Sequence, residues 1–243
     1  MFANTETLSR ASHELRTPLN AILGFGQLLS LDELNESQRH SVDQIMAGGR
    51  HLLALIEDLL DYSRLDADKL ERVPVDVGAQ IAGAVSLCGG LAGERSLHVT
   101  VDAGDEPLWV RADARRLRQV LLNLISNAIK YNRPNGSITV RARPDGADDV
   151  RVDVIDSGIG MTYGQLTRLF QPFERLDAPL RGIEGNGLGL VVSKAMIEAM
   201  DGTIDVASTP GTGSVFSIRL LAAEAVAAEP AVALPAPVLA HAA

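Results

Sequence analysis

Cysteine and positive charge are both scarce in this chain of 243 residues. Cys88 is the one cysteine, so no disulfide can form within the chain, which suits a reducing compartment. Lysine and arginine number 22 against 31 aspartates and glutamates, for a formal net charge of −9. This acidic balance argues against nucleic acid and against anionic membrane surfaces as partners.

Long apolar runs are also missing. No stretch reaches the roughly 18 apolar residues that a membrane-spanning helix needs, and no signal-peptide pattern is present. The sequence therefore predicts a cytoplasmic chain that does not insert into a membrane. Any sensing or membrane segment is then expected to be absent, removed or carried by another protein. With 46% hydrophobic residues, the chain can still bury one large core or two ordinary ones.

Two segments near the N-terminus carry apolar residues in steps of three, four and seven. Residues 4–30 and a second segment that begins near Ser37 have the pattern of amphipathic helices with a coiled-coil-like seam. They should form an antiparallel hairpin, whose apolar stripe is too wide for two helices to bury. Dimerisation into a four-helix bundle would bury it. The alternative is that the hairpin packs on the rest of its own chain.

The first of these helices contains the stretch Ser-His-Glu-Leu-Arg-Thr-Pro-Leu-Asn at 12–20. If Leu8 and Leu15 occupy heptad position a, His13 falls at position f and faces solvent. Pro18 removes a hydrogen bond inside the helix and should bend its axis. An exposed histidine is usually only solvated, so His13 becomes a candidate site only through the motifs downstream.

From about residue 71 the pattern changes to short strands and helices. We expect helices over 77–92, 113–131 and 188–200, and strands over 97–101, 108–110, 137–143, 150–156, 203–208 and 214–220. This mixture predicts an α+β sandwich with helices on one face of a mixed sheet. The predicted organisation is multidomain: an α-helical hairpin over 1–70, the α+β domain over 71–221, and a disordered Ala/Pro-rich tail over 222–243.

The helix over 113–131 carries a second, polar stripe. Gln119, Asn123 and Asn127 recur every four residues, with Lys130 beside them. Asparagine is a poor helix former, its amide oxygen suits Mg²⁺, and a lysine suits a phosphate. The other interpretation of this pattern is an ordinary solvated helix face.

The first of two glycine-containing stretches follows a strand. Asp156 ends that strand, and Gly158 and Gly160 come directly after it. A carboxylate at this place can accept a hydrogen bond from an exocyclic amine such as that of adenine. The same residues are also good chemistry for an ordinary turn.

The second stretch contains Gly185, Gly187 and Gly189 and leads into a helix. It matches neither a Walker A loop nor a dinucleotide-binding pattern, but the start of a helix offers free N–H groups to a phosphate. Before it, residues 176–184 lack periodicity, which fits a mobile lid or an ordinary surface loop.

Together and in this order, these stretches resemble a bacterial sensor histidine kinase with a dimerisation and phosphotransfer hairpin. Residues 12–20 are similar to the phosphoacceptor box of that family, and 123–131 to its N box. Residues 156–160 and 185–189 are similar to its two glycine boxes, and 170–173 to its F box. The resemblance covers residues 4 to about 221.

The resemblance implies a role for each matching residue. His13 would take the γ-phosphoryl group of ATP, Glu14 would keep the imidazole neutral and nucleophilic, and Thr17 would position water for a reverse, phosphatase reaction. ATP and Mg²⁺ are the implied cofactors, with Asn127 as the metal ligand. The implied ATP-binding residues are Asn123, Asn127, Lys130, Tyr131, Asp156, Gly158, Gly160, Phe173, Gly185, Gly187, Leu188 and Gly189.

The function that follows is an ATP-dependent protein-histidine kinase. A homodimer would phosphorylate itself at His13 and pass the group to an aspartate of a response-regulator receiver domain. Two other classes are open: a dimeric scaffold with a degenerate ATP domain, and a chaperone- or gyrase-like ATPase. The scaffold would acquire no acid-labile phosphate, and the ATPase would keep full turnover after His13→Ala.

Overall fold

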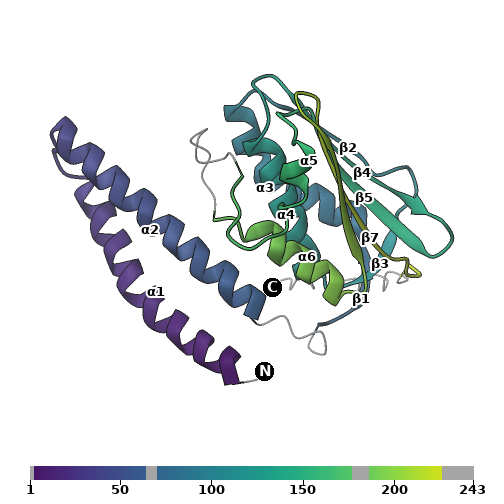
Figure 1. The fold of residues 1–243 in the computed structure, drawn as a ribbon, viewed down its shortest axis with the longest axis horizontal. Helices are drawn as coiled ribbons and strands as arrows, with labels where there is room; N and C mark the ends of the chain where they lie inside the picture. The colour runs from purple at the N-terminus through teal and green to yellow at the C-terminus, as the bar shows by residue number, and fades with distance from the viewer. Residues whose placement is uncertain (1–2, 64–69, 177–185, 226–243) are drawn as a thin grey trace, which may run out of the picture.

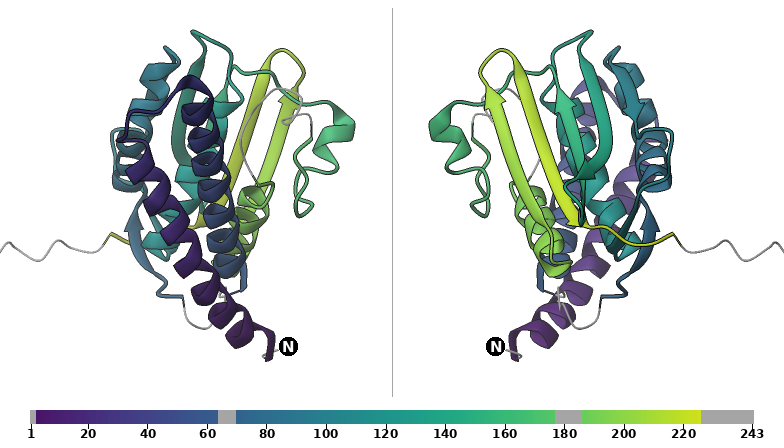
Figure 2. Two further views of the ribbon diagram at one scale, coloured as in Figure 1. Left: turned by 90° about the vertical axis from the view of Figure 1, so that its left-hand side faces the viewer. Right: turned by 90° about the vertical axis from the view of Figure 1, so that its right-hand side faces the viewer.

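The computed structural model describes residues 3–63, 70–176 and 186–225, and for residues 3–13, 51 and 57–63 it describes the backbone alone. Helices α1 (Ala3–Leu29) and α2 (Glu36–Ser63) form an antiparallel hairpin beside a mixed α/β domain (Figure 1). Helix α2 is the one that faces this domain. The N-terminal end of α1 projects beyond it, as Figure 2 shows. The predicted hairpin is therefore confirmed.

Glycines let the two helices of the hairpin approach each other closely. A Cβ atom at Gly26 would lie 2.5 Å from Sδ of Met46, and one at Gly49 would lie 2.7 Å from Cδ2 of Leu23. Helix α1 continues through Pro18 without a break. Among the hairpin side chains that the structure describes, the buried apolar ones are Leu19, Val42, Met46 and Ile56.

Five strands form the main sheet of the α/β domain. Their order is β2 (His98–Asp102), β4 (Ser137–Asp145), β5 (Asp149–Asp156), β7 (Gly213–Leu221) and β6 (Thr203–Thr209). Strands β2 and β4 are parallel and the other neighbours are antiparallel. A second, two-stranded sheet pairs β1 (Val73–Asp76) with β3 (Trp109–Ala112).

Three helices cover one face of the main sheet (Figure 1): α3 (Val77–Glu94), α4 (Ala114–Lys130) and α6 (Gly189–Ala199). Asp113 starts α4 by accepting hydrogen bonds from the N–H groups of Arg115 and Arg116. A capping box at Thr162 starts a short helix, α5 (Tyr163–Leu166), which was not predicted. The helices and the sheet enclose the core, which confirms the predicted fold class.

The chain remains bonded to the domain just past the predicted boundary at 221. The N–H of Ala222 donates to the carbonyl of Asp148 at 2.7 Å, and that of Ala223 to the carbonyl of Trp109 at 2.9 Å. Ala222 directly follows the last pair between β5 and β7, Asp149 with Leu221, and it also forms a bridge with Val110 at the edge of β3. Residues 226–243 of the predicted tail lie outside the described residues. Among the helices described, none combines the length and apolarity that crossing a bilayer requires.

Candidate functional site

A cavity of about 460 Å³ lies between α4, α6 and the main sheet. This volume is in the range of small-molecule sites. The predicted residues that line it are Asn123, Asn127, Lys130, Tyr131, Asp156, Gly160, Gly187 and Gly189. Gly158, Phe173 and Leu188 are not among its lining residues, and Gly185 lies outside the described residues. Most of the predicted set therefore converges on one site.

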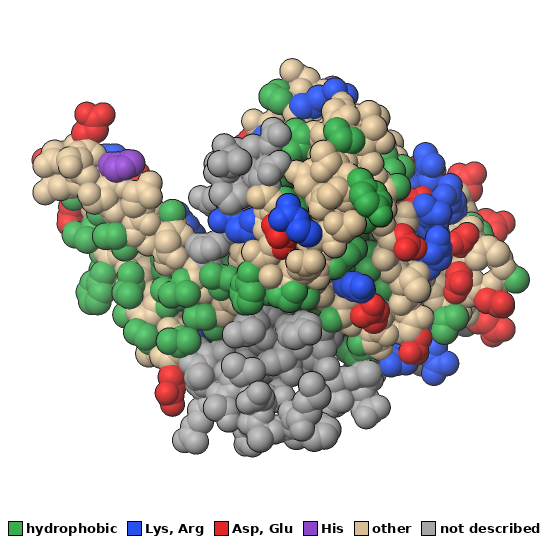
Figure 3. Space-filling view, viewed as in Figure 1, with side chains coloured by type: hydrophobic (Ala, Val, Ile, Leu, Met, Phe, Trp, Pro, Cys, Tyr) green, Lys and Arg blue, Asp and Glu red, His purple; other side chains and the backbone are tan. Residues whose placement is uncertain are grey.

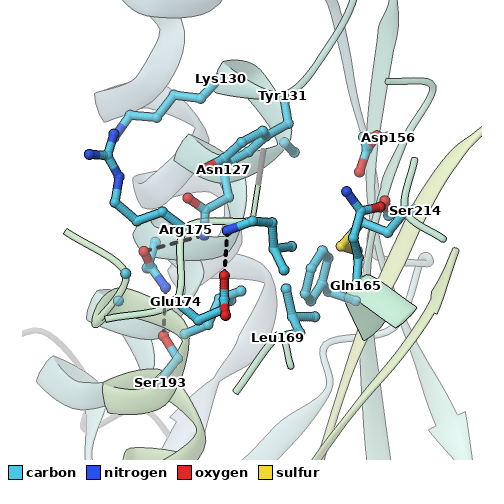
Figure 4. Close-up of a pocket in the computed structure, with 18 of the residues that line it drawn as sticks. Asn127, Lys130, Tyr131, Asp156, Gln165, Leu169, Glu174, Arg175, Ser193 and Ser214 are labelled. Atoms are coloured by element: carbon cyan, nitrogen blue, oxygen red, sulfur yellow. Dashed lines mark hydrogen bonds between the residues drawn. The ribbon is translucent and has the colours of Figure 1, made fainter. Parts of the chain in front are cut away.

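Hydrogen bonds orient the amide of Asn127 toward this cavity. Its Nδ2 lies 3.5 Å from Oδ1 of Asn123, and Nδ2 of Asn123 donates to Oγ of Ser193 at 2.8 Å (Figure 4). The spacing of four residues brings both asparagines to one face of α4. With its Nδ2 directed to Asn123, Asn127 has Oδ1 available to a ligand. The polar stripe is thus part of the cavity wall and not simply a solvated face.

Asp156 lies on another side of the cavity, at the end of β5 (Figure 4). Its Oδ1 accepts a hydrogen bond from the N–H of Gly158 at 2.8 Å, and Ser214 donates from both its backbone and its hydroxyl. Burial nevertheless raises the pKa of the Asp156 carboxyl, because these hydrogen bonds do not fully replace water. A buried acid in a cavity, with its charge incompletely compensated, is suited to accept an N–H of a ligand.

Cationic side chains line the side of the cavity opposite Asp156 in Figure 4. Lys130 and Arg175 both lie there. Burial raises the pKa of the nearby Tyr131 phenol, and the charge of Arg175 opposes this shift. The cavity therefore has an acid on one side and positive charge on the other. It suits a ligand with an amine at one end and anionic groups at the other.

The glycines of the site make room for the chain's own backbone. A Cβ at Gly158 would lie 2.3 Å from the carbonyl oxygen of Tyr131, and one at Gly160 would lie 2.0 Å from that of Thr209. Gly160 also has a φ of +65°, which a side chain disfavours. These close approaches hold the turn after Asp156 in place. Gly158 therefore acts behind the cavity wall, which the motif alone did not reveal.

Glycines at the start of α6 have the same kind of role. Gly187 has a φ of +71°, and a Cβ there would lie 2.7 Å from the carbonyl carbon of Phe173. A Cβ at Gly189 would lie 2.5 Å from Oδ1 of Asn123, so glycine lets α6 pack against the polar stripe of α4. Leu188 is buried and anchors this turn in the core.

Sequence reasoning assigned no site role to several lining residues. Ser214 stands opposite Asp156 in the β5–β7 register, so the pairing of the two strands could have identified it. Ala54 comes from α2 in the hairpin, and no local pattern marks it. Further lining residues of this kind are Gln165, Leu169, Glu174, Arg175, Ser193 and Phe216.

The predicted residues of the hairpin lie apart from this cavity. His13 belongs to α1, and its side chain is outside what the structure describes. Glu14 and Thr17 are exposed on the same helix. Within the described part of the chain, the lining of the cavity takes one residue from the hairpin, Ala54, and none from α1.

Two family models match the chain. Residues 3–68 match the His Kinase A (phospho-acceptor) domain, and residues 112–224 match the Histidine kinase-, DNA gyrase B-, and HSP90-like ATPase. In order and in extent these are the hairpin and most of the α/β domain. The chain belongs to the histidine kinase family, as its motifs predict.

Individual relatives agree with this assignment. The Sensor protein GacS of Pseudomonas syringae pv. syringae is 40% identical over 224 residues, which is 89% of this chain and 25% of that protein. The Non-motile and phage-resistance protein of Caulobacter vibrioides is 40% identical over 230 residues, which is 90% of this chain and 27% of that protein. The chain thus spans about a quarter of the curated relatives it matches.

Solved structures show the same fold. Full-length ShkA in complex with AMPPNP has a TM-score of 0.76 and 32% identity, covering 91% of this chain and 47% of that one. The histidine kinase AdeS of Acinetobacter baumannii has a TM-score of 0.60 and 26% identity, covering 86% of this chain and 97% of that one.

Proposed function

We propose that this chain is the core of an ATP-dependent protein-histidine kinase that phosphorylates itself at His13. The observation that carries the proposal is the polarity of the cavity in the α/β domain. Asp156 can accept the adenine amino group, while Lys130 and Arg175 can neutralise phosphates on the other side. The same chain carries the phosphoacceptor hairpin. A scaffold that has lost nucleotide binding would not need this charge arrangement.

The proposed reaction is a phosphoryl transfer from ATP to an imidazole. A ring nitrogen of His13 attacks the γ-phosphorus, a P–N bond forms, and the bond to the β–γ bridging oxygen breaks. ADP leaves with that electron pair, and Glu14 accepts the proton of the other ring nitrogen. The phosphoryl group then passes to an aspartate of a receiver domain. In the opposing phosphatase reaction Thr17 positions a water that attacks the aspartyl phosphate of the regulator, and inorganic phosphate leaves.

The residues of the cavity fit a nucleotide that carries Mg²⁺. No described group of three or more histidine, cysteine or acidic side chains could hold a metal ion alone, but Mg²⁺ commonly takes phosphate oxygens, waters and few protein ligands. Oδ1 of Asn127 would be such a ligand, held by Asn123 and Ser193. Bound there, Mg²⁺ would neutralise charge on the phosphates. Asn127, Lys130 and Arg175 then position the γ-phosphoryl group.

The surface of the hairpin supports a homodimer. Leu15, Ile22 and Leu29 recur every seven residues on α1, yet between 46% and 53% of each side chain is exposed. Ile45 and Leu52 on α2 are exposed to a similar degree. Figure 3 shows apolar side chains gathered along the hairpin. A second copy would bury this stripe in a four-helix bundle.

The alternative is that the hairpin packs on the rest of its own chain, and only a small part of it does so. Leu55 of α2 packs against the core of the α/β domain, but the stripe described above stays exposed. A receiver-domain partner and a cytoplasmic location remain predictions.

Incubation of the chain with ATP labelled at the γ-phosphate and Mg²⁺ tests the proposal. We expect acid-labile, base-stable label on His13, and none in His13→Gln. His40→Gln is the matched control, because His40 is an exposed histidine on α2, and it should keep the label. Label on a different side chain, or none at all, contradicts the proposal. Full ATP turnover by His13→Gln would indicate an ATPase of the gyrase-like class instead.

A further inference from the structure

Arg72 connects the start of the α/β domain to the end of α6. It directly precedes β1, and its Nη1 pairs with the carboxylate of Asp201. Its Nη2 donates to the carbonyl oxygen of Ala199 at 2.6 Å. Ala199 is the last residue of α6, where carbonyl groups lack partners within the helix. A guanidinium at this place satisfies such a group and meets the negative end of the helix dipole.

The residue before Arg72 is attached to α4. The N–H of Glu71 lies 3.4 Å from Oδ2 of Asp113, the residue that caps the start of α4. The N–H of Asp113 in turn donates to Sδ of Met200, directly after α6. The chain therefore meets both helices that form the walls of the cavity. Arg72 supplies the stronger of the two attachments, because its hydrogen bonds come from a charged guanidinium and go to two acceptors.

The opposite end of α6 belongs to the nucleotide site. The helix starts at Gly189, which lines the cavity, and it runs 11 residues to Ala199. Oγ of Ser193, on the second turn, holds Asn123 at 2.8 Å. A rigid helix of this length, about 16 Å, fixes the distance between the cavity and Ala199. Arg72 is thus held at a set position relative to any nucleotide in the cavity.

We propose that Arg72 is a positioning residue for phosphoryl transfer. It holds the chain directly before β1 against the C-terminal end of α6, so that nucleotide at the other end of α6 meets the hairpin in one orientation. Arg72 itself does not line the cavity, so it acts on orientation and not on nucleotide affinity. The role rests on the proposed kinase function.

The kinetic test compares Arg72→Gln with Arg219→Gln. Arg219 is a matched control because it also bridges two acceptors, Asp145 and Asp205, and lies on the outer face of the sheet away from the hairpin. At saturating Mg²⁺-ATP we expect Arg72→Gln to phosphorylate His13 about tenfold more slowly, with ATP affinity within about twofold of wild type. Arg219→Gln should keep both values. Arg72→Lys should recover part of the rate, because an ammonium cannot bridge both acceptors as a planar guanidinium does.

A distance measurement tests the role without any chemistry. Spin labels at exposed positions Arg39 on α2 and Asp105 in the α/β domain, in a Cys88→Ser background, report how the hairpin sits relative to the cavity. We expect Arg72→Gln to broaden the distance distribution and Arg219→Gln to leave it unchanged.

The outcomes separate this inference from the proposed function. If the wild-type chain acquires no label on His13, the proposed function fails, and a distance distribution unchanged in Arg72→Gln then overturns the inference as well. If wild type is labelled and Arg72→Gln matches it in rate, only the inference fails. A loss of ATP affinity as large as the loss of rate would also overturn it, since that pattern indicates a damaged fold.

Discussion

Two aspartates on strand β5 are both buried, and their surroundings act on them in opposite ways. Asp153 is 2% exposed and Asp156 is 8% exposed. Because side chains alternate along a strand, residues three apart point to opposite faces of the sheet. Asp156 faces the helices and the cavity, and Asp153 faces outward.

Asp153 is surrounded by donors and cations. Its Oδ1 accepts from Oγ of Ser217 and from Nε of Arg151, both at 2.6 Å, and Arg143 lies 3.3 Å from its Oδ2. Burial raises the pKa of this carboxyl, but the hydrogen bonds from Ser217 and Arg151 and the charges of Arg151 and Arg143 together lower it below its ordinary value. The charge is fully compensated within the protein.

Asp156 accepts hydrogen bonds from Gly158 and Ser214, but no cation contributes to lowering its pKa. The effect of burial is therefore larger than that of the hydrogen bonds, and the pKa is raised. These two carboxylates are therefore two different kinds of buried acid. An acid compensated by its own protein stabilises the scaffold, whereas an acid left short of partners beside a cavity is available to a ligand.

The largest expected effect is on nucleotide binding by Asp156→Asn. The substitution removes the charge that would accept the adenine amine, and the lost hydrogen bond weakens ATP binding by about 1.5–3 kcal/mol, or roughly 10–100-fold. The folded chain should be at least as stable as wild type, because a poorly compensated buried charge is gone. Calorimetric titration with ATP and thermal unfolding measure the two quantities. Unchanged affinity would show that Asp156 is not the adenine acceptor.

Asp153→Asn should have the reverse profile. It removes an acceptor from Ser217 and both arginines, and we expect the free energy of unfolding to fall by about 1–2 kcal/mol, discounted for the exposure of Arg143. ATP affinity should not change. Asp102→Asn is the control, since its ion pair with Arg141 is largely exposed and such pairs contribute little. If Asp153→Asn weakens ATP binding instead, the two acids do not divide the roles as described.

The pH dependence of stability should differ in sign between the two positions. The pKa of Asp153 is lowered from 3.8, so its stabilising contribution is present above about pH 3.8 and is lost as pH falls through the lower, folded pKa. The pKa of Asp156 is raised from 3.8, so its destabilising contribution is fully present above the folded pKa, shrinks as the pH falls below that value, and is gone below about pH 3.8.

Urea unfolding from neutral to acidic pH measures both contributions. The stability advantage of wild type over Asp153→Asn should shrink in acid. The free energy of unfolding of wild type should instead rise relative to that of Asp156→Asn as the pH falls. Differences that run in the same direction would contradict the comparison.

The smallest effects are expected from the two serines of β7 that serve these acids. Ser217→Ala should lower the free energy of unfolding by about 0.5–1.5 kcal/mol without changing ATP affinity. Ser214→Ala should raise the pKa of the Asp156 carboxyl further and weaken ATP binding by only a few-fold, about 0.5–1 kcal/mol. Carboxyl titration by NMR and ATP titration distinguish the two variants. Equal effects on ATP affinity would show that the two sheet faces are not independent.

Local patterns in the sequence were enough to predict most of the helices and strands and several of the residues that line the cavity. The helix expected over 113–131 is α4, Ala114–Lys130, and the strand expected over 150–156 is β5, Asp149–Asp156. Apolar periodicity and caps such as Asp113 act over a few residues, so the sequence contains them locally. Asn123, Asn127 and Asp156 could be identified for the same reason, because each stands in a short motif.

The surroundings of each residue became visible only in the folded structure. In the sequence Val-Asp-Val-Ile-Asp the two aspartates of β5 have similar neighbours, and nothing local predicts that their pKa values shift in opposite directions. Ser217 stands 64 residues from the acid it serves, and Ala54 reaches the cavity from the hairpin. Burial and charge compensation arise from segments that meet only on folding. For that reason the division between scaffold acid and site acid could not be predicted from the chain alone.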